Sequence, residues 1–265
     1  MNEKTNDVLR EFFKRNNWKY FEPNPSPWDP TEPLPEVQVG FEKEIKEIEN
    51  YINSGTGILA VTGQPGEGKT QLTLVVKKKL DEDEYVIPVY YERPPLDEKN
   101  FVFGIASALF EYKILKKPFV KFLTPTNDYI GAYTFSRLKE EIKKNIGDKY
   151  KIVLFCDEAH TGDPALSLHL FKTLSDDKSL HVKLIFSGYE SRGVSLSELL
   201  GKTYSDRITK DIRMPGLSVE QLKQMVIDRL KFRCGHEASI DVFKNILEAA
   251  CRDAGMRPRK ALKLK

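Results

Sequence analysis

A glycine-rich stretch near residue 65 carries the clearest chemical signal in this sequence. Residues 63–70 read GQPGEGKT and match the pattern GxxxxGK[ST], after an apolar run and before a helix-like stretch. Glycines allow backbone N–H groups to converge on phosphate oxygens at a helix N-terminus, and the ammonium group of Lys69 neutralises phosphate charge. We expect ATP to be bound by Gly63, Pro65, Gly66, Glu67, Gly68, Lys69, Thr70 and Gln71.

A pair of carboxylates follows another apolar run. Residues 151–156 read KIVLFC and lead directly into Asp157 and Glu158. Such a run is typical of a strand buried on both faces, and ligands of open α/β sheets bind at the carboxyl ends of the strands. We expect Asp157 and Thr70 to hold Mg²⁺ and Glu158 to orient or deprotonate the attacking water, so that ATP is hydrolysed as well as bound.

His160 completes the letters DEAH and raises the alternative of a helicase of the DEAH-box kind. Such helicases have two stacked motor domains, an SAT motif and an arginine-rich final motif. The 265 residues are too few for two motor domains and contain neither motif. We therefore set the helicase aside and interpret His160 as a loop residue or hydrogen-bond partner outside the catalytic set.

Alternating strand-like and helix-like stretches surround these residues. Apolar runs at 58–61, 85–91, 151–156 and 182–186 predict strands, and the intervening stretches 101–112, 134–146 and the segment opened by Asp163 and Pro164 predict helices. This alternation predicts an α/β fold with a parallel sheet. After residue 216 the strand signals stop, and a capping box of Ser218 and Gln221 and a cap at Ser239 predict a small α-helical subdomain.

The sequence divides into three expected regions. Residues 1–37 contain a helix at 6–16 and a strap in which six of the 15 prolines fall. Residues 38–215 form the nucleotide-binding domain, and residues 216–265 form the helical subdomain. A protein partner, if there is one, is expected to bind through the helical subdomain or the strap.

Composition narrows the classes of partner and compartment. Lys and Arg number 42 against 39 Asp and Glu, a net charge of +3, so no global basic field indicates nucleic acid, and any DNA contact is local. The three cysteines lack CxxC spacing, which favours a reducing cytoplasm. No window approaches the roughly 18 apolar residues of a membrane span, so we expect no membrane contact.

Beyond these motifs, the chain from about Val39 onward resembles an AAA+ ATPase. The resemblance implies a three-layer P-loop AAA+ domain followed by a helical lid. Residues 39–44 read VGFEKE and are similar to the family's entry beside the adenine, with Phe41 in place of the usual arginine. The resemblance makes Ser187 a first sensor that helps to hold water, Arg207 a finger that reaches a neighbour's γ-phosphate, and Arg259 a second sensor that touches the nucleotide.

Within AAA+, the P-loop region and residues 217–222 (LSVEQL) most resemble one branch. This branch contains the origin-recognition initiators, the ExeA-type ATPases and the transposition regulators of the TnsC and MuB kind. Initiators carry a winged-helix domain after the lid, whereas this sequence ends at Lys265. The difference favours a compact TnsC-like or ExeA-like ATPase, or a shortened chain.

Two functions remain open from the sequence. In the first, ATP closes a homo-oligomeric ring or filament on duplex DNA, acting in transposition or replication, and hydrolysis releases it. Lysines around Phe119, namely Lys113, Lys116, Lys117 and Lys121, could contact phosphates, although a solvated basic loop has the same composition. In the second, the chain is a signalling or assembly ATPase that acts on proteins without nucleic acid.

Overall fold

The computed structural model describes residues 33–114, 131–146, 149–163, 167–189 and 196–234. These residues form two compact units. One contains residues 33–41, 65–71 and 215–234, and the other contains residues 42–64 and the described part of 72–214. The expected division at residues 37 and 215 stays a prediction.

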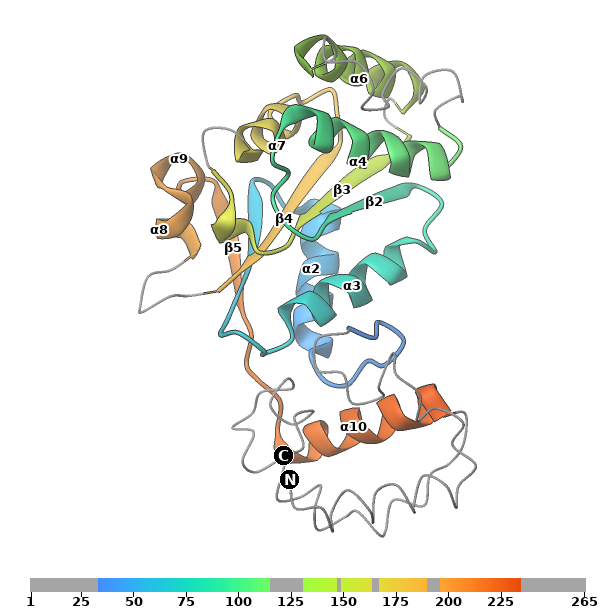
Figure 1. Ribbon diagram of the computed structural model, residues 1–265, viewed down its shortest axis with the longest axis vertical. Helices are drawn as coiled ribbons and strands as arrows, with labels where there is room; N and C mark the ends of the chain where they lie inside the picture. The colour runs from blue at the N-terminus through green and yellow to red at the C-terminus, as the bar shows by residue number, and fades with distance from the viewer. Residues whose placement is uncertain (1–32, 115–130, 147–148, 164–166, 190–195, 235–265) are drawn as a thin grey trace. The chain divides into compact units, whose positions relative to one another are not determined.

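A five-stranded parallel sheet forms the centre of the larger unit (Figure 1). Its strand order is β2-β3-β4-β1-β5. The strands are β1 (Ile58–Thr62), β2 (Val86–Tyr91), β3 (Lys151–Cys156), β4 (Val182–Gly188) and β5 (Ile208–Arg213). Because all of the strands run in parallel, their carboxyl ends lie at one edge of the sheet, which we call the carboxyl edge, and the opposite edge is the amino edge.

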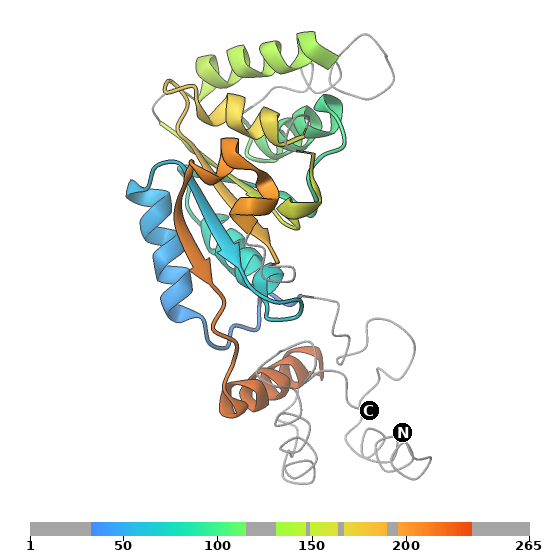
Figure 2. The ribbon, with the colours of Figure 1, turned by 90° about the vertical axis from the view of Figure 1, so that its left-hand side faces the viewer.

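Helices alternate with the strands along the chain. The helices that come before or between the strands are α2 (Glu42–Ser54), α3 (Lys69–Leu80), α4 (Glu98–Glu111), α6 (Gly131–Asn145), η1 (Ala159–Thr161), α7 (Ser167–Ser175), α8 (Leu196–Leu200) and α9 (Lys202–Ser205). Helix α4 packs against β2 and α7 against β4. Helix α6 lies outside α4, farther from the sheet, in both views (Figures 1 and 2). Every helix among the described residues is too short or too polar to cross a bilayer.

Both faces of the sheet are covered, as the apolar runs predict. On one face, alternate strand residues such as Ile87, Leu154 and Phe186 form a core with α4, α6, α7, α8 and α9. The residues between them, such as Leu59 and Phe155, are also buried, which is the pattern of a sheet with helices on two sides. The Tyr51 hydroxyl of α2 donates to the carbonyl oxygen of Gly57 (2.7 Å), and burial raises the pKa of Tyr51 to about 12.

The structure confirms the expected α/β fold and extends it. The four predicted strands are present, and α4 begins at Glu98, earlier than expected, because the Asp97 side chain caps it by accepting from the backbone N–H of Asn100 (2.7 Å). Strand β5 corrects the expectation from the sequence, which predicted no strand over residues 208–213. It lies at the end of the strand order and exposes most of its residues, so it lacks the apolar run of a central strand.

The described residues of the smaller unit contain the first turn of α3 and one whole helix, α10 (Val219–Cys234). Its predicted capping box is confirmed: Ser218 N–H donates to Gln221 Oε1 (2.9 Å), and Gln221 N–H donates to Ser218 Oγ (3.2 Å). The predicted helices at 6–16 and after Ser239 lie outside the described residues.

Candidate active site

The glycine-rich loop has the backbone that its composition predicts. Gly66 and Gly68 adopt φ of 86° and 98°, values that side-chain-bearing residues rarely reach. Helix α3 then begins at Lys69, whose side chain is buried, while Thr70 is half-buried. A helix N-terminus that follows such a loop presents N–H groups and positive charge to an anion.

Gln71, in the first turn of α3, has a role that the sequence did not indicate. Its side-chain amide Nε2 donates to the carbonyl oxygens of Leu34 (2.5 Å) and Val37 (3.0 Å). Its Oε1 accepts from the Leu34 N–H (2.8 Å). One side chain therefore fastens the segment just before Val39 to the end of the loop. Val39 itself is half-buried.

The carboxylate of Asp157 is surrounded by donors at the carboxyl edge. Ser187 Oγ donates to Oδ1, Tyr90 Oη donates to Oδ2 (3.2 Å), and the Glu158 N–H donates to Oδ1 (2.9 Å). Asp157 and Ser187 are both buried. Strand register explains the contact, because Cys156 pairs with Phe186 and the next residues are Asp157 and Ser187. A carboxylate held by three donors in this way is fixed in orientation.

Burial and the neighbouring Asp157 carboxylate raise the pKa of Tyr90 well above its ordinary value. The Tyr90 hydroxyl therefore stays protonated and remains a donor. The sequence did not indicate a role for Tyr90 at the site, because its run YVIPVYY carries only a strand signal. Tyr90 pairs with Phe155, two residues before Asp157, and this pairing brings the Tyr90 hydroxyl to the carboxylate. The pairing could not be predicted, because the register between two strands cannot be read from either strand alone.

Glu158 turns away from β3 in an unusual backbone conformation. Its φ of 49° and ψ of 35° lie in the left-handed region, which costs a non-glycine residue about 1 kcal/mol or more. Its side chain is 42% exposed, and Oε2 lies 3.3 Å from His160 Nε2. Glu158, the expected base, directly follows Asp157, the expected Mg²⁺ ligand. Both residues lie at the carboxyl edge of the sheet, where β1 ends at Thr62.

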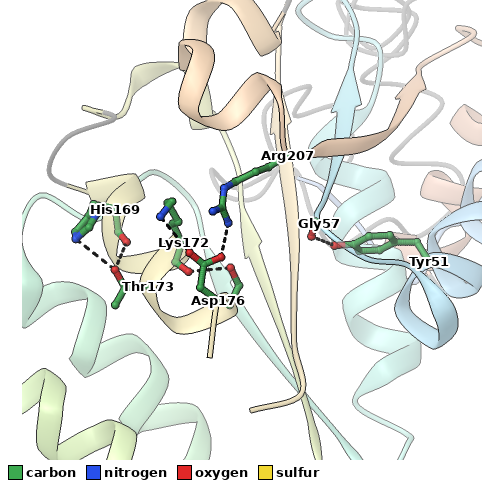
Figure 3. Close-up of polar contacts among 8 residues, drawn as sticks. Tyr51, Gly57, His169, Lys172, Thr173, Asp176 and Arg207 are labelled. Carbon is green, nitrogen blue, oxygen red and sulfur yellow. Dashed lines mark hydrogen bonds and ion pairs between the residues drawn. The ribbon is translucent and has the colours of Figure 1, made fainter. Parts of the chain in front are cut away.

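Arg207 lies at the other edge of the sheet. It precedes β5, and its carbonyl oxygen accepts from the Ile58 N–H (2.8 Å) at the start of β1. Its guanidinium forms an ion pair with Asp176, just after α7, and Asp176 also accepts from Lys172 (3.0 Å), as Figure 3 shows. The larger unit thus brings Asp157, Glu158 and Ser187 together and separates Arg207 from them by the length of the strands.

Comparison with known proteins shows the family to which this chain belongs. Residues 52–192 match a family model described as an AAA domain, and this match covers more than half of the chain. The chain belongs to the AAA domain family. This AAA+ membership identifies the chain as a P-loop ATPase and confirms the resemblance seen in the sequence.

Solved structures share the fold of this AAA+ chain. The Aeropyrum pernix ORC2 protein in its ADPNP–ADP complexes has a TM-score of 0.59 at 16% identity, with 89% of this chain and 63% of that chain covered. Cdc6p from Pyrobaculum aerophilum gives 0.58 at 16% identity, with coverage of 89% and 62%.

The Aeropyrum pernix ORC1 protein in complex with DNA has a TM-score of 0.57 at 17% identity, with 89% of this chain and 61% of that chain covered. The AAA+ chain therefore spans less than two thirds of the length of these initiators. No curated protein matches the sequence.

Some expected site residues of the AAA+ chain lie outside the described residues. These are the second sensor, Arg259, and the basic positions Lys116, Lys117 and Lys121. Their roles stay predictions, as do the nucleotide contacts expected of Val39 and the loop.

Proposed function

We propose that this AAA+ chain hydrolyses ATP with Mg²⁺ and acts as an ATP-controlled oligomeric switch on duplex DNA. The observation that carries the hydrolytic part is the hydrogen-bonded Asp157 carboxylate with Glu158 beside it. A magnesium ion with nucleotide takes one or two protein oxygens and completes its shell with phosphate oxygens and water. Asp157 and the Thr70 hydroxyl have the required chemistry.

Each residue then has a defined task. The loop N–H groups and Lys69 would bind the β- and γ-phosphates and neutralise their charge. Asp157 and Thr70 would hold Mg²⁺, which would supply further positive charge to the phosphates. Glu158 accepts a proton from the attacking water or orients it, and Ser187 helps to hold that water. Ser187 also donates to Asp157, so one hydroxyl supports the metal ligand as well.

The DNA part of the proposal draws on the fold likeness to the initiators, one of which was solved with DNA. With a net charge of +3, contacts to phosphates have to be local, so binding should be weak in the monomer and strengthened by assembly. The same near-neutral charge favours the second candidate, an assembly ATPase that acts on proteins alone.

Fluorescence anisotropy with a labelled duplex tests the DNA part. Glu158→Gln protein, which binds ATP but hydrolyses it slowly, should bind duplexes of unrelated sequence when ATP is present and release them as salt rises. Lys69→Ala protein serves as the control that cannot bind ATP. If Glu158→Gln protein with ATP binds no DNA at low salt, the DNA switch is wrong and the assembly ATPase replaces it.

The hydrolytic part is measured separately as phosphate release. Wild-type protein should hydrolyse ATP only with a divalent cation, whereas Lys69→Ala protein should neither bind nor hydrolyse it. Glu158→Gln should keep ATP affinity and lose the chemical step by a factor on the order of 100 or more. Normal turnover in Glu158→Gln protein would contradict the role assigned to this carboxylate.

A further inference from the structure

Glu158 is held at three points by its neighbours. Its N–H donates to Asp157 Oδ1 (2.9 Å), and its carbonyl oxygen accepts from both the N–H and the Oγ1 of Thr161 (2.8 Å each). The third point is its carboxylate, with Oε2 3.3 Å from His160 Nε2. The first two contacts fix the left-handed backbone, and only the third acts on the group that would meet water.

The imidazole ring of His160 is itself confined. Its side chain is 9% exposed, and its ring packs edge-on against Tyr189, with centroids 4.2 Å apart and an interplanar angle of 81°. Gly188 lies close by: a Cβ added there would come 3.3 Å from His160 Nδ1 and 2.7 Å from Leu196 Cδ1. A buried ring between these groups has little rotational freedom, whereas the Glu158 side chain beside it is 42% exposed.

Because the His160 ring is confined and the Glu158 side chain is exposed, their contact restricts the Glu158 carboxylate. An exposed glutamate side chain has several rotamers and loses conformational entropy when it is fixed in one of them. A neutral imidazole with its proton on Nε2 donates to one carboxylate oxygen and leaves the other oxygen to accept from water. The confined ring can therefore select one carboxylate orientation before ATP is bound.

We propose that His160 is a positioning residue for hydrolysis, which fixes the orientation of the Glu158 carboxylate that activates water. The inference rests on the proposed ATP hydrolysis and adds to it a residue outside the set of catalytic candidates. It also connects two elements, because Tyr189 directly follows β4, the strand that carries Ser187. Water would thus be held by Ser187 and Glu158 while the end of β4 supports the orientation of the base.

Variants of His160 separate positioning from simple core packing. His160→Ala removes the ring, and His160→Gln retains an N–H donor that can reach the Glu158 carboxylate. His169→Ala is the matched control, because His169 is a histidine of α7 that is exposed and contacts Thr173 Oγ1 (3.3 Å; Figure 3). The readouts are ATP affinity by fluorescent-nucleotide titration, single-turnover hydrolysis and thermal unfolding.

His160→Ala should bind ATP with wild-type affinity and hydrolyse it on the order of 10- to 100-fold more slowly. His160→Gln should recover a substantial part of the rate, and His169→Ala should match wild type. In a Glu158→Gln background, adding His160→Ala should slow hydrolysis no further, because the two residues act as a unit.

Three results would overturn the inference while leaving ATP hydrolysis in place. They are a wild-type rate in His160→Ala, equal losses of affinity and rate, and a His160→Gln protein that folds but is no faster than His160→Ala. If His160→Ala does not fold, the comparison of His160→Gln with wild type and the effect of His160→Gln in the Glu158→Gln background decide the question. Wild-type protein without ATPase activity would instead refute the proposed function itself.

Discussion

At the scale of single residues, the site depends on how hydroxyl groups hold one carboxylate. Asp157 is buried, and a buried polar group is costly unless hydrogen-bond partners surround it. Ser187 and Tyr90 each donate from a hydroxyl group, on the strands that flank β3. The backbone N–H of Glu158 is the third donor. These neighbours fix the direction of any metal bond that Asp157 makes, as outer hydrogen bonds do in metal sites generally.

Removing the Tyr90 hydroxyl tests this arrangement. Tyr90→Phe keeps the ring and deletes the donor to Asp157 Oδ2, so the carboxylate should be less well oriented for Mg²⁺. We expect the Mg²⁺ concentration for half-maximal ATPase activity to rise about 10-fold, which a Mg²⁺ titration at saturating ATP measures. The exposed Tyr85→Phe, on the same chain segment, is the control. An unchanged Mg²⁺ requirement in Tyr90→Phe would show that Ser187 and the backbone suffice.

At the scale of elements, side chains join segments that are far apart in the sequence. Gln71 fastens α3 to the segment at Leu34 and Val37 within the smaller unit. In the larger unit, Asp177, between α7 and β4, pairs with Lys139 (3.1 Å) and Lys143 (2.9 Å) of α6. Each connection uses polar groups, and the hydrophobic core alone does not specify it.

Gln71→Glu tests the hydrogen bonds that the Gln71 amide donates to Leu34 and Val37. The substitution keeps the size of the side chain but replaces two N–H donors by a carboxylate that faces the Leu34 and Val37 carbonyl oxygens. The free energy of unfolding should fall by about 1–3 kcal/mol, measured by denaturant titration without nucleotide. Gln38→Glu, at an exposed position of the same segment, should change it by less than about 0.5 kcal/mol. Equal effects of the two variants would refute the role of the Gln71 amide.

Asp177 predicts a pH dependence with a definite sign. Hydrogen bonds from Ser179 and from Lys143 and Lys139 lower the pKa of its carboxyl group well below the ordinary value. A carboxyl group with a lowered pKa stabilises the fold above its unfolded pKa of about 3.9, and this stabilisation is lost as pH falls below that value. Asp177→Asn should therefore unfold more easily than wild type at pH 7, and the difference should shrink from pH 4 to pH 3. Unfolding midpoints across this range measure it; a constant difference would contradict the prediction.

At the scale of the whole molecule, the two edges of the sheet separate the candidate catalytic groups. Arg207 precedes β5 at the amino edge, whereas Asp157 and Glu158 follow β3 at the carboxyl edge. A five-residue strand such as β1 is roughly 16 Å long, which exceeds the reach of an arginine side chain. If Arg207 stabilises phosphoryl transfer, it acts at the site of another protomer, where its permanent charge suits the transition state.

Mixing two inactive variants tests this arrangement. Arg207→Ala protein should bind ATP without turning it over, and Lys69→Ala protein should not bind ATP. Mixed together, they should regain part of the wild-type phosphate release, because intact Arg207 of one protomer then faces an intact loop of the other. Arg207→Lys protein measured alone provides the comparison for charge without the guanidinium group. No recovery at any ratio would leave Arg207 as the partner of Asp176 and nothing more.

The sequence alone was sufficient for much of this protein because its signals are local. The GQPGEGKT loop, the apolar run ending in Asp157 and Glu158, and the Ser218 capping box each depend on neighbours within a few residues, and the alternation of apolar runs predicts the parallel sheet. Strand β5 was missed because an edge strand needs few buried residues, so its pattern is weak.

Only the tertiary structure decided which distant side chains meet. Tyr90 reaches Asp157, His160 packs on Tyr189, and Gln71 binds Leu34 through strand register and chain reversals that no local pattern encodes. The opposite positions of Arg207 and Glu158 likewise follow from the parallel direction of strands that are far apart in sequence. The sequence determined the chemical groups of the site because chemistry resides in residue types. Their contacts were determined by packing, because contact depends on the path of the whole chain.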